Sequence, residues 1–123
     1  MKLQTIINQL SFPLWVEQLL YRLWFRCSEP VHVRFRQKWL RDDVWQTVSE
    51  HENGCEELRK ACYVCLKHDN WEVVERAISC LFVIGSPIDI EFIEPLLEHP
   101  EECVRKSART CIFEIKNRFV EPT

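Results

Sequence analysis

The chain has 123 residues, the size of a single domain. Its composition, 46% hydrophobic and 28% charged, is that of a globular protein, and two glycines are too few for the many tight turns of an all-β fold. The net charge of −3 is uneven, because residues 1–41 carry a basic excess and residues 42–123 an acidic one. This asymmetry is typical of a surface that steers a charged partner, although an ordinary solvated surface shows it equally well.

Membrane and export signals are not evident in the sequence. No apolar run reaches the roughly 18 residues that a membrane span needs, and the start lacks the pattern of an export signal. Most of the seven cysteines occupy apolar positions of helical patterns, where a reduced thiol behaves as a small hydrophobic group. We therefore expect a cytoplasmic protein with reduced thiols and no membrane contact.

The chain begins with apolar residues at the spacing of a short amphipathic helix, namely Leu3, Ile6, Ile7 and Leu10. Ser11 and Pro13 are typical of the start of a second helix, and the Leu- and aromatic-rich stretch that follows predicts that this helix is buried. A third helix is predicted over residues 30–49. The β-branched Val31 and Val33 at its start also suit an extended segment.

Asn53-Gly54 is the clearest break in the chain, because Asn-Gly favours a turn. Four helices are predicted after it, over residues 55–67, 71–84, 88–98 and 101–119. Gly85 and Pro87 are typical of the end of the second of these. The helical spacing directs one set of apolar side chains of the first inward, namely Leu58, Ala61, Cys62, Cys65 and Leu66.

An internal repeat relates the helices at 71–84 and 101–119. A shift of 31 residues matches Val73 with Val104, Ala77 with Ala108, Leu81 with Ile112, and Ile84 with Ile115. Surface positions differ between the two copies while the apolar positions persist. A repeat of this period indicates helical units that bury their faces against one another.

The repeat resembles the HEAT-repeat family, including its shorter bacterial versions. The second copy matches the family pattern through Pro100, Val104-Arg105, Ala108, Ile112 and Ile115. The first matches through Asp69, Val73, Ala77, Leu81, Ile84 and Gly85. Val74 departs from the pattern, in which an Arg follows the Val. The resemblance covers residues 55–118, and no clean copy precedes residue 55.

The architecture that we expect is all-α, a short α-solenoid of about three antiparallel HEAT-like helix pairs within a single domain spanning residues 1–123. The expected pairs are 12–27 with 30–49, 55–67 with 71–84, and 88–98 with 101–119. Residues 1–50 form either a divergent repeat or an N-terminal cap, and residues 55–119 hold the two clearer repeats. Stacked pairs of this kind expose a shallow concave surface that the second helix of each pair lines.

Candidate catalytic and metal-binding groups are weak in this sequence. Cys55, Cys62, Cys65 and His68 have zinc-ligand residue types, but Cys55 and His68 lie roughly 20 Å apart along one helix. No cysteine stands in a recognisable nucleophile context, and the adjacent carboxylates Glu101-Glu102 do not face each other on a helix. We expect no enzyme activity, no metal and no cofactor.

The candidate protein-binding surface combines charged residues with one tryptophan. The outward side of the helix at 71–84 is predicted to carry Trp71, Glu72, Glu75, Arg76 and Ser79. The comparable side of the helix at 101–119 is predicted to carry Glu102, Arg105, Lys106 and Arg109. An exposed Trp among charges is typical of an interface anchor, although Trp71 could instead pack against the core.

The leading functional hypothesis is a non-catalytic protein-binding module. A short HEAT-like protein with an acidic face is similar to immunity proteins that neutralise a paired toxin, and an acidic surface suits a basic toxin. A scaffold, adaptor or assembly factor in a larger complex is the alternative. A third hypothesis is nucleic-acid binding by a basic, aromatic stripe. The residues of this stripe are Arg34, Phe35, Arg36, Lys38, Trp39 and Arg41.

Overall fold

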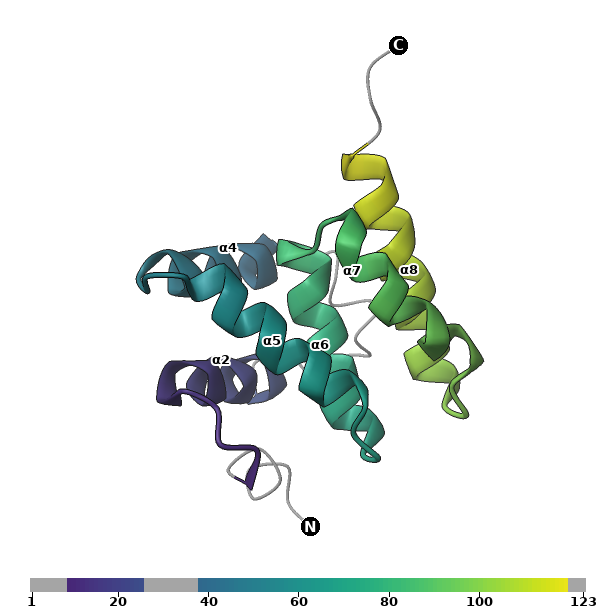
Figure 1. Ribbon diagram of the computed structural model, residues 1–123, viewed down its shortest axis with the longest axis horizontal. Coiled ribbons are helices and arrows are strands. Elements are labelled where there is room, and N and C mark those ends of the chain that lie inside the picture. The colour runs from purple at the N-terminus through teal and green to yellow at the C-terminus, as the bar shows by residue number, and fades with distance from the viewer. Residues whose placement is uncertain (1–8, 26–37, 120–123) are drawn as a thin grey trace.

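The computed structural model describes residues 9–25 and 38–119, and every regular element in these ranges is a helix (Figure 1). The all-α prediction is confirmed for this part of the chain. The elements are α2 (Leu14–Phe25), α4 (Lys38–Ser49), α5 (Gly54–Leu66), α6 (Trp71–Ile84), α7 (Pro87–Ile93), the 3₁₀ helix η1 (Glu94–Glu98) and α8 (Glu102–Arg118). Most of the predicted first helix, together with Val31 and Val33, lies outside the described residues. None of the described helices has the length and hydrophobicity needed to cross a membrane.

The predicted helix at 88–98 is two elements in the structure. Helix α7 ends at Ile93, and Glu94–Glu98 continues as the 3₁₀ helix η1. Pro95 stands in the first turn of η1, and a proline removes one backbone donor and crowds the preceding turn. The α-helical hydrogen-bond ladder therefore stops here, although the apolar spacing continues.

Helix α6 is the centre of the fold and lies between α5 and α8 in Figure 1. It packs against both of these helices and also against α4 and α2. Every residue from Val73 to Ile84 is buried as a result. The apolar positions of the internal repeat are all buried, as are the five inward residues predicted for α5. The spacing of apolar residues therefore identified the core faces of α5, α6 and α8 correctly.

The ends of α6 are set by two different residues. The Asn70 side chain accepts a hydrogen bond from the Glu72 N–H at 2.8 Å and caps the start of the helix. Gly85 follows the last residue with φ −63°, so the left-handed conformation that often favours glycine at this position is absent. Gly85 is instead required by space, because a Cβ there would lie 2.7 Å from Ile115 Cδ1 and would clash with the Leu81 carbonyl oxygen.

Candidate protein-interaction face

The surface predicted on α6 is not present in the structure. Trp71 is exposed and Glu72 is partly exposed, but Glu75, Arg76 and Ser79 are buried. The prediction that these three residues face outward was wrong. The sequence pattern shows the more polar side of α6, whereas neighbouring helices cover that side as well as the apolar one.

The residues predicted on α8 have mixed positions. Glu102, Lys106 and Arg109 are exposed, and Lys106 forms an ion pair with Glu102 at 3.3 Å. Arg105 is partly buried and donates hydrogen bonds to the carbonyl oxygens of His99 and Pro100 at 2.6 and 2.9 Å. Arg105 thus stabilises the turn between η1 and α8. Because much of the α6 set is buried, the nine predicted residues do not form one exposed surface.

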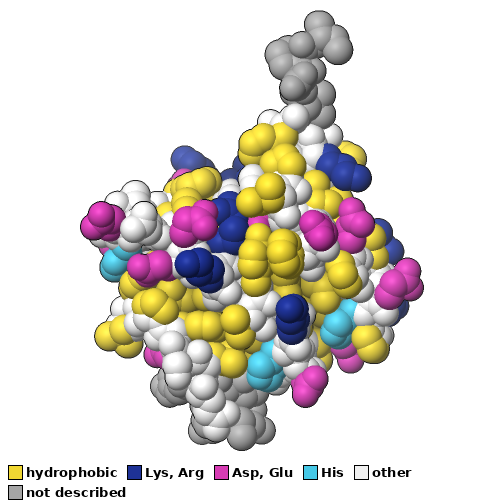
Figure 2. All heavy atoms as spheres, in the orientation of Figure 1, with side chains coloured by type: hydrophobic (Ala, Val, Ile, Leu, Met, Phe, Trp, Pro, Cys, Tyr) yellow, Lys and Arg dark blue, Asp and Glu magenta, His cyan; other side chains and the backbone are white. Residues whose placement is uncertain are grey.

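Large exposed apolar side chains occur instead on the side of the molecule formed by α5, α7 and η1, which we call the α5–α7 face. Ile88 is 65% exposed, Val64 50% and Phe92 42%. Figure 2 shows hydrophobic side chains spread across this face, with charged side chains between and around them. Exposed apolar groups that cluster in this way are typical of a surface that binds another macromolecule.

Two apolar hollows flank α5 on this face. The first lies between α5 and the segment Leu10–Pro13, has a volume of about 350 Å³, and is lined by Ala61 and Val64 from α5. The second lies between α5 and the α7–η1 segment and has a volume of about 220 Å³. Its lining residues are Tyr63, Leu66, Lys67, Glu91, Phe92, Pro95 and Leu96. Val64 stands on the ridge of α5 beside the first hollow, and each hollow is large enough to receive an apolar side chain.

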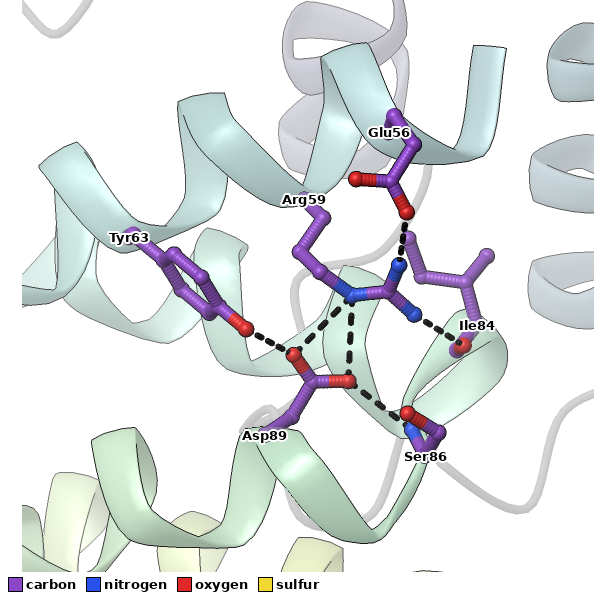
Figure 3. Close-up of polar contacts among 6 residues, drawn as sticks. All are labelled: Glu56, Arg59, Tyr63, Ile84, Ser86 and Asp89. Atoms are coloured by element: carbon purple, nitrogen blue, oxygen red, sulfur yellow. Dashed lines mark hydrogen bonds and ion pairs between the residues drawn. The ribbon is translucent and has the colours of Figure 1, made fainter. Parts of the chain in front are cut away.

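A buried ionic network fixes α7 against α5 (Figure 3). The fully buried Asp89 carboxylate accepts hydrogen bonds from Arg59 Nε at 3.0 Å, from the Ser86 backbone N–H at 2.8 Å and from the Tyr63 hydroxyl. Arg59 also contacts Glu56 at 2.7 Å and the Ile84 carbonyl oxygen at 3.5 Å. A buried carboxylate with this many donors is fully satisfied, and it joins α5, α7 and the end of α6.

The electrostatics of this network favour a structural role over acid–base chemistry. Burial lowers the pKa of Arg59, but the charge of Asp89 and its hydrogen bond outweigh burial and raise it overall. Burial, and then the hydrogen bond to Asp89, raise the pKa of the Tyr63 hydroxyl well above its usual range. Tyr63 therefore remains a hydrogen-bond donor at physiological pH. Because Asp89 has no exposed surface, a substrate has no access to its oxygens.

The network also orients the aromatic part of the face. The Tyr63 ring, held by Asp89, stacks on the Phe92 ring with centroids 4.0 Å apart and an interplanar angle of 16°. Both rings line the second hollow. Offset or stacked aromatic pairs are rigid apolar surfaces with little conformational entropy left to lose on binding. The second hollow is therefore formed before any partner arrives.

We call the exposed charged residues of α5 with its C-cap, of α7 and of η1 the rim of the α5–α7 face, and these residues are mainly acidic. Its exposed carboxylates are Glu56, Glu57, Glu91, Glu94 and Glu98, and its exposed ammonium groups are Lys60 and Lys67. This excess of negative charge around an apolar centre favours a partner whose apolar anchors are surrounded by basic side chains.

The sequence contained weak signals for this face. Val64 occupies an outward position of α5, and Phe92 is an apolar residue within a helix whose inward positions are already filled by Ile93 and Leu96. Neither position can be recognised as part of one surface until α5 and α7 are known to lie side by side. Among the described residues, no group of three or more His, Cys, Asp or Glu side chains is arranged to hold a metal ion.

Comparisons of the chain with protein-family models, curated proteins and solved structures find no match.

Proposed function

We propose that this chain is a non-catalytic protein-binding module that binds its partner through the α5–α7 face. The observation that carries the proposal is the pair of apolar hollows around exposed Val64 and Phe92, held in place by the buried Asp89 network. A preformed apolar surface with anchor pockets is the type of surface on which binding energy concentrates in protein complexes.

The particular function that we favour is that of an immunity protein that binds and neutralises a cognate toxin. The acidic rim supports this proposal, because many toxins that attack nucleic acid are expected to be basic, and opposite charges accelerate association. In this proposal α5 with α6, and α7–η1 with α8, are HEAT-like helix pairs of a short solenoid. The packing of α5 against α6 and of α7 and η1 against α8 supports that pairing, and the packing of α6 against α8 supports the stacking of the two pairs.

An adaptor or assembly factor is the second candidate, and the Tyr63–Phe92 stack favours it. A permanent complex would rely on the apolar hollows more than on the acidic rim. The two candidates therefore differ in salt dependence. The association rate of an immunity protein with a basic toxin should fall markedly as the salt concentration is raised. The association rate of an adaptor that binds through apolar contacts should change little.

The test uses the purified product of the neighbouring gene as partner and two substitutions on the face, Val64→Asp and Phe92→Asp. Phe113→Asp is the matched control, because Phe113 is an exposed aromatic residue on α8, away from both hollows. We expect each face variant to weaken binding at least tenfold, about 1.4 kcal/mol, while the control binds normally. Growth rescue by the wild-type chain, when the partner is toxic, would distinguish the immunity protein from the adaptor. Equal affinity of all three variants would move the interface to another surface.

A further inference from the structure

A third hollow lies on a different side of the molecule from the α5–α7 face, between α4, α8 and the end of α6. It has a volume of about 300 Å³ and is lined by Arg41, Trp45, Val83, Glu114 and Arg118. We call it the α4–α8 pocket. It differs from the hollows of the α5–α7 face, because two guanidinium groups and one carboxylate meet at an indole ring and an aliphatic side chain.

The charges of the described residues that line this pocket do not balance. Among these residues Glu114 is the one carboxylate, and it serves both arginines at long range, at 3.6 Å from Arg41 and 4.0 Å from Arg118. Neither distance is that of a strong charge-assisted hydrogen bond. One unit of negative charge is therefore shared by two units of positive charge.

Arg118 is fixed at the wall of the pocket by hydrogen bonds. It donates hydrogen bonds to the carbonyl oxygens of Val83, at 2.8 Å, and Phe82, which belong to the last turn of α6. Burial lowers the pKa of Arg118, so its surroundings do not fully compensate for the loss of water around its charge. The helix end supplies about half a negative charge and still leaves the pocket positive.

Arg41 is the more exposed of the two arginines that line the pocket among the described residues. Its side chain is 52% exposed, and its contacts are the distant Glu114 and the Phe82 ring, whose centroid lies 5.4 Å from its guanidinium carbon. The same ring also faces Arg118 at 5.7 Å. Both guanidinium groups therefore lie close to the same aromatic ring. Most of the donors of Arg41 point to no protein acceptor among the described residues, so they remain available to a ligand.

Trp45 supplies an apolar wall beside these charges. It is 48% exposed and stands one helical turn after Arg41 on α4. Residues four apart lie on the same side of a helix, so an indole face and a guanidinium group flank the same opening. Indole rings stack well on planar groups, and guanidinium groups bind carboxylates and phosphates in a bidentate manner.

We propose that the α4–α8 pocket is a binding site for a small organic anion, in which Arg41 binds a phosphate or carboxylate group and Trp45 contacts the aromatic ring that carries it. The volume is at the lower end of the range for small-molecule sites, which suits a single ring with one anionic group. This site is separate from the protein-binding face and does not depend on the function proposed for that face.

The experiment measures binding of phenyl phosphate by NMR, from the shift of the Trp45 indole N–H signal, which is assigned with Trp45→Phe. We expect saturable binding with a dissociation constant of about 1 mM or below. Inorganic phosphate lacks the ring and benzyl alcohol lacks the charge, so each should bind at least tenfold more weakly. Benzoate in place of phenyl phosphate shows whether a carboxylate or a phosphate is preferred.

Two charge-matched variants make the assignment specific. Arg41→Gln removes the ligand-binding cation and should weaken the binding of phenyl phosphate at least tenfold. Arg109→Gln removes the same charge from an exposed position on α8 outside the pocket. Its affinity for phenyl phosphate should remain within twofold of that of the wild type. Both arginines are exposed, so both variants should fold. The proposal is wrong if the Trp45 signal does not move at about 10 mM phenyl phosphate, or if the two variants lose affinity equally.

Discussion

The Asp89 carboxylate has one role within its own helix and a second role that depends on the packing of α7 against α5. At the start of α7 it accepts the Ser86 backbone N–H, as a carboxylate in the first turn of a helix commonly does. The fold then brings Arg59 and Tyr63 from α5 to the same carboxylate. One side chain consequently caps its own helix and fixes a neighbouring one.

Replacing Asp89 with Asn should destabilise the protein by about 3 kcal/mol, because Arg59 would keep its charge without a buried carboxylate. The free energy of unfolding in urea measures this loss. Glu56→Gln is the control, since Glu56 is exposed and contacts the same Arg59, and the expected loss there is below about 1 kcal/mol. Similar losses for both variants would show that the buried carboxylate is not the centre of the network.

Buried thiols should make the protein sensitive to alkali. Burial raises the pKa of Cys65 and of Cys111 from 9.0 to about 12 in each case. The folded state therefore holds the thiol protons more tightly than the unfolded state does. The stability that each protonated thiol contributes to the folded state is fully present below pH 9 and is lost as the pH rises towards 12. The free energy of unfolding should fall above pH 9 by up to about 1.4 kcal/mol per pH unit for each thiol.

The variant Cys65→Ala tests this cause. Its stability should run parallel to that of the wild type between pH 6 and about 8, where the thiol is protonated in both states. Above pH 9 its stability should fall less steeply. Parallel curves over the whole range would mean that the Cys65 thiol does not contribute to alkaline unfolding.

At the scale of the elements, helix ends determine where the chain turns back onto α6. Asn53, with φ 57°, adopts the left-handed conformation just before α5, and Asn70 caps α6 through its side chain. Asparagine tolerates both roles, because its short amide can hydrogen-bond to the local backbone. The break predicted from Asn53-Gly54 is therefore correct, and Asn53 is the residue that adopts the unusual conformation.

Asn70→Ala should reduce the free energy of unfolding by about 1 kcal/mol, because the Glu72 N–H loses its acceptor. Thermal or urea unfolding measures the change. Asp69→Ala changes an exposed neighbour that does not cap α6 and should have less than half this effect. If Asp69→Ala lowers the free energy of unfolding as much as Asn70→Ala does, the Asn70 side chain is not the cap of α6.

Gly85→Ala should destabilise the packing of α6 against α8 by about 1–3 kcal/mol, since the added methyl group meets Ile115 and the Leu81 carbonyl oxygen. Unfolding in urea provides the measurement. Asn117→Ala, at an exposed position late in α8, should change stability by no more than about 0.5 kcal/mol. An unchanged stability in Gly85→Ala would mean that Ile115 moves aside at little cost.

At the scale of the whole molecule, the charges of the described surfaces differ from one side to another. The rim of the α5–α7 face is rich in glutamate, while exposed Lys106, Arg109 and Lys116 give α8 a basic surface. Both surfaces belong to residues 42–123, the acidic part of the sequence, so this asymmetry in space comes from the packing of the helices and does not follow the charge difference between residues 1–41 and 42–123.

The double variant Glu91→Lys with Glu94→Lys should slow association with a basic partner at least tenfold at low salt and reduce its dependence on salt. Stopped-flow association rates at several salt concentrations measure this effect. Both residues are exposed, whereas Glu75 is buried and its reversal to Lys would disturb the core. Glu102→Lys on α8 is the control, and an equal reduction there would indicate attraction by net charge alone.

The sequence by itself determined the helical class, the inward faces of α5, α6 and α8, and most of the helix ends. These features depend on residue spacing and local backbone chemistry, which act within about one helical turn. The internal repeat extended this local information to two units, and its matched apolar positions are all buried.

Only the tertiary structure decided which surfaces remain exposed. Glu75 and Arg76 are polar residues on α6, a helix that four other helices contact. Their side chains therefore do not reach solvent. Val64 and Phe92 are apolar, yet they remain exposed because α5 and α7 lie at the edge of the packing. Burial depends on contacts between segments far apart in the chain, and helical periodicity contains no information about those contacts.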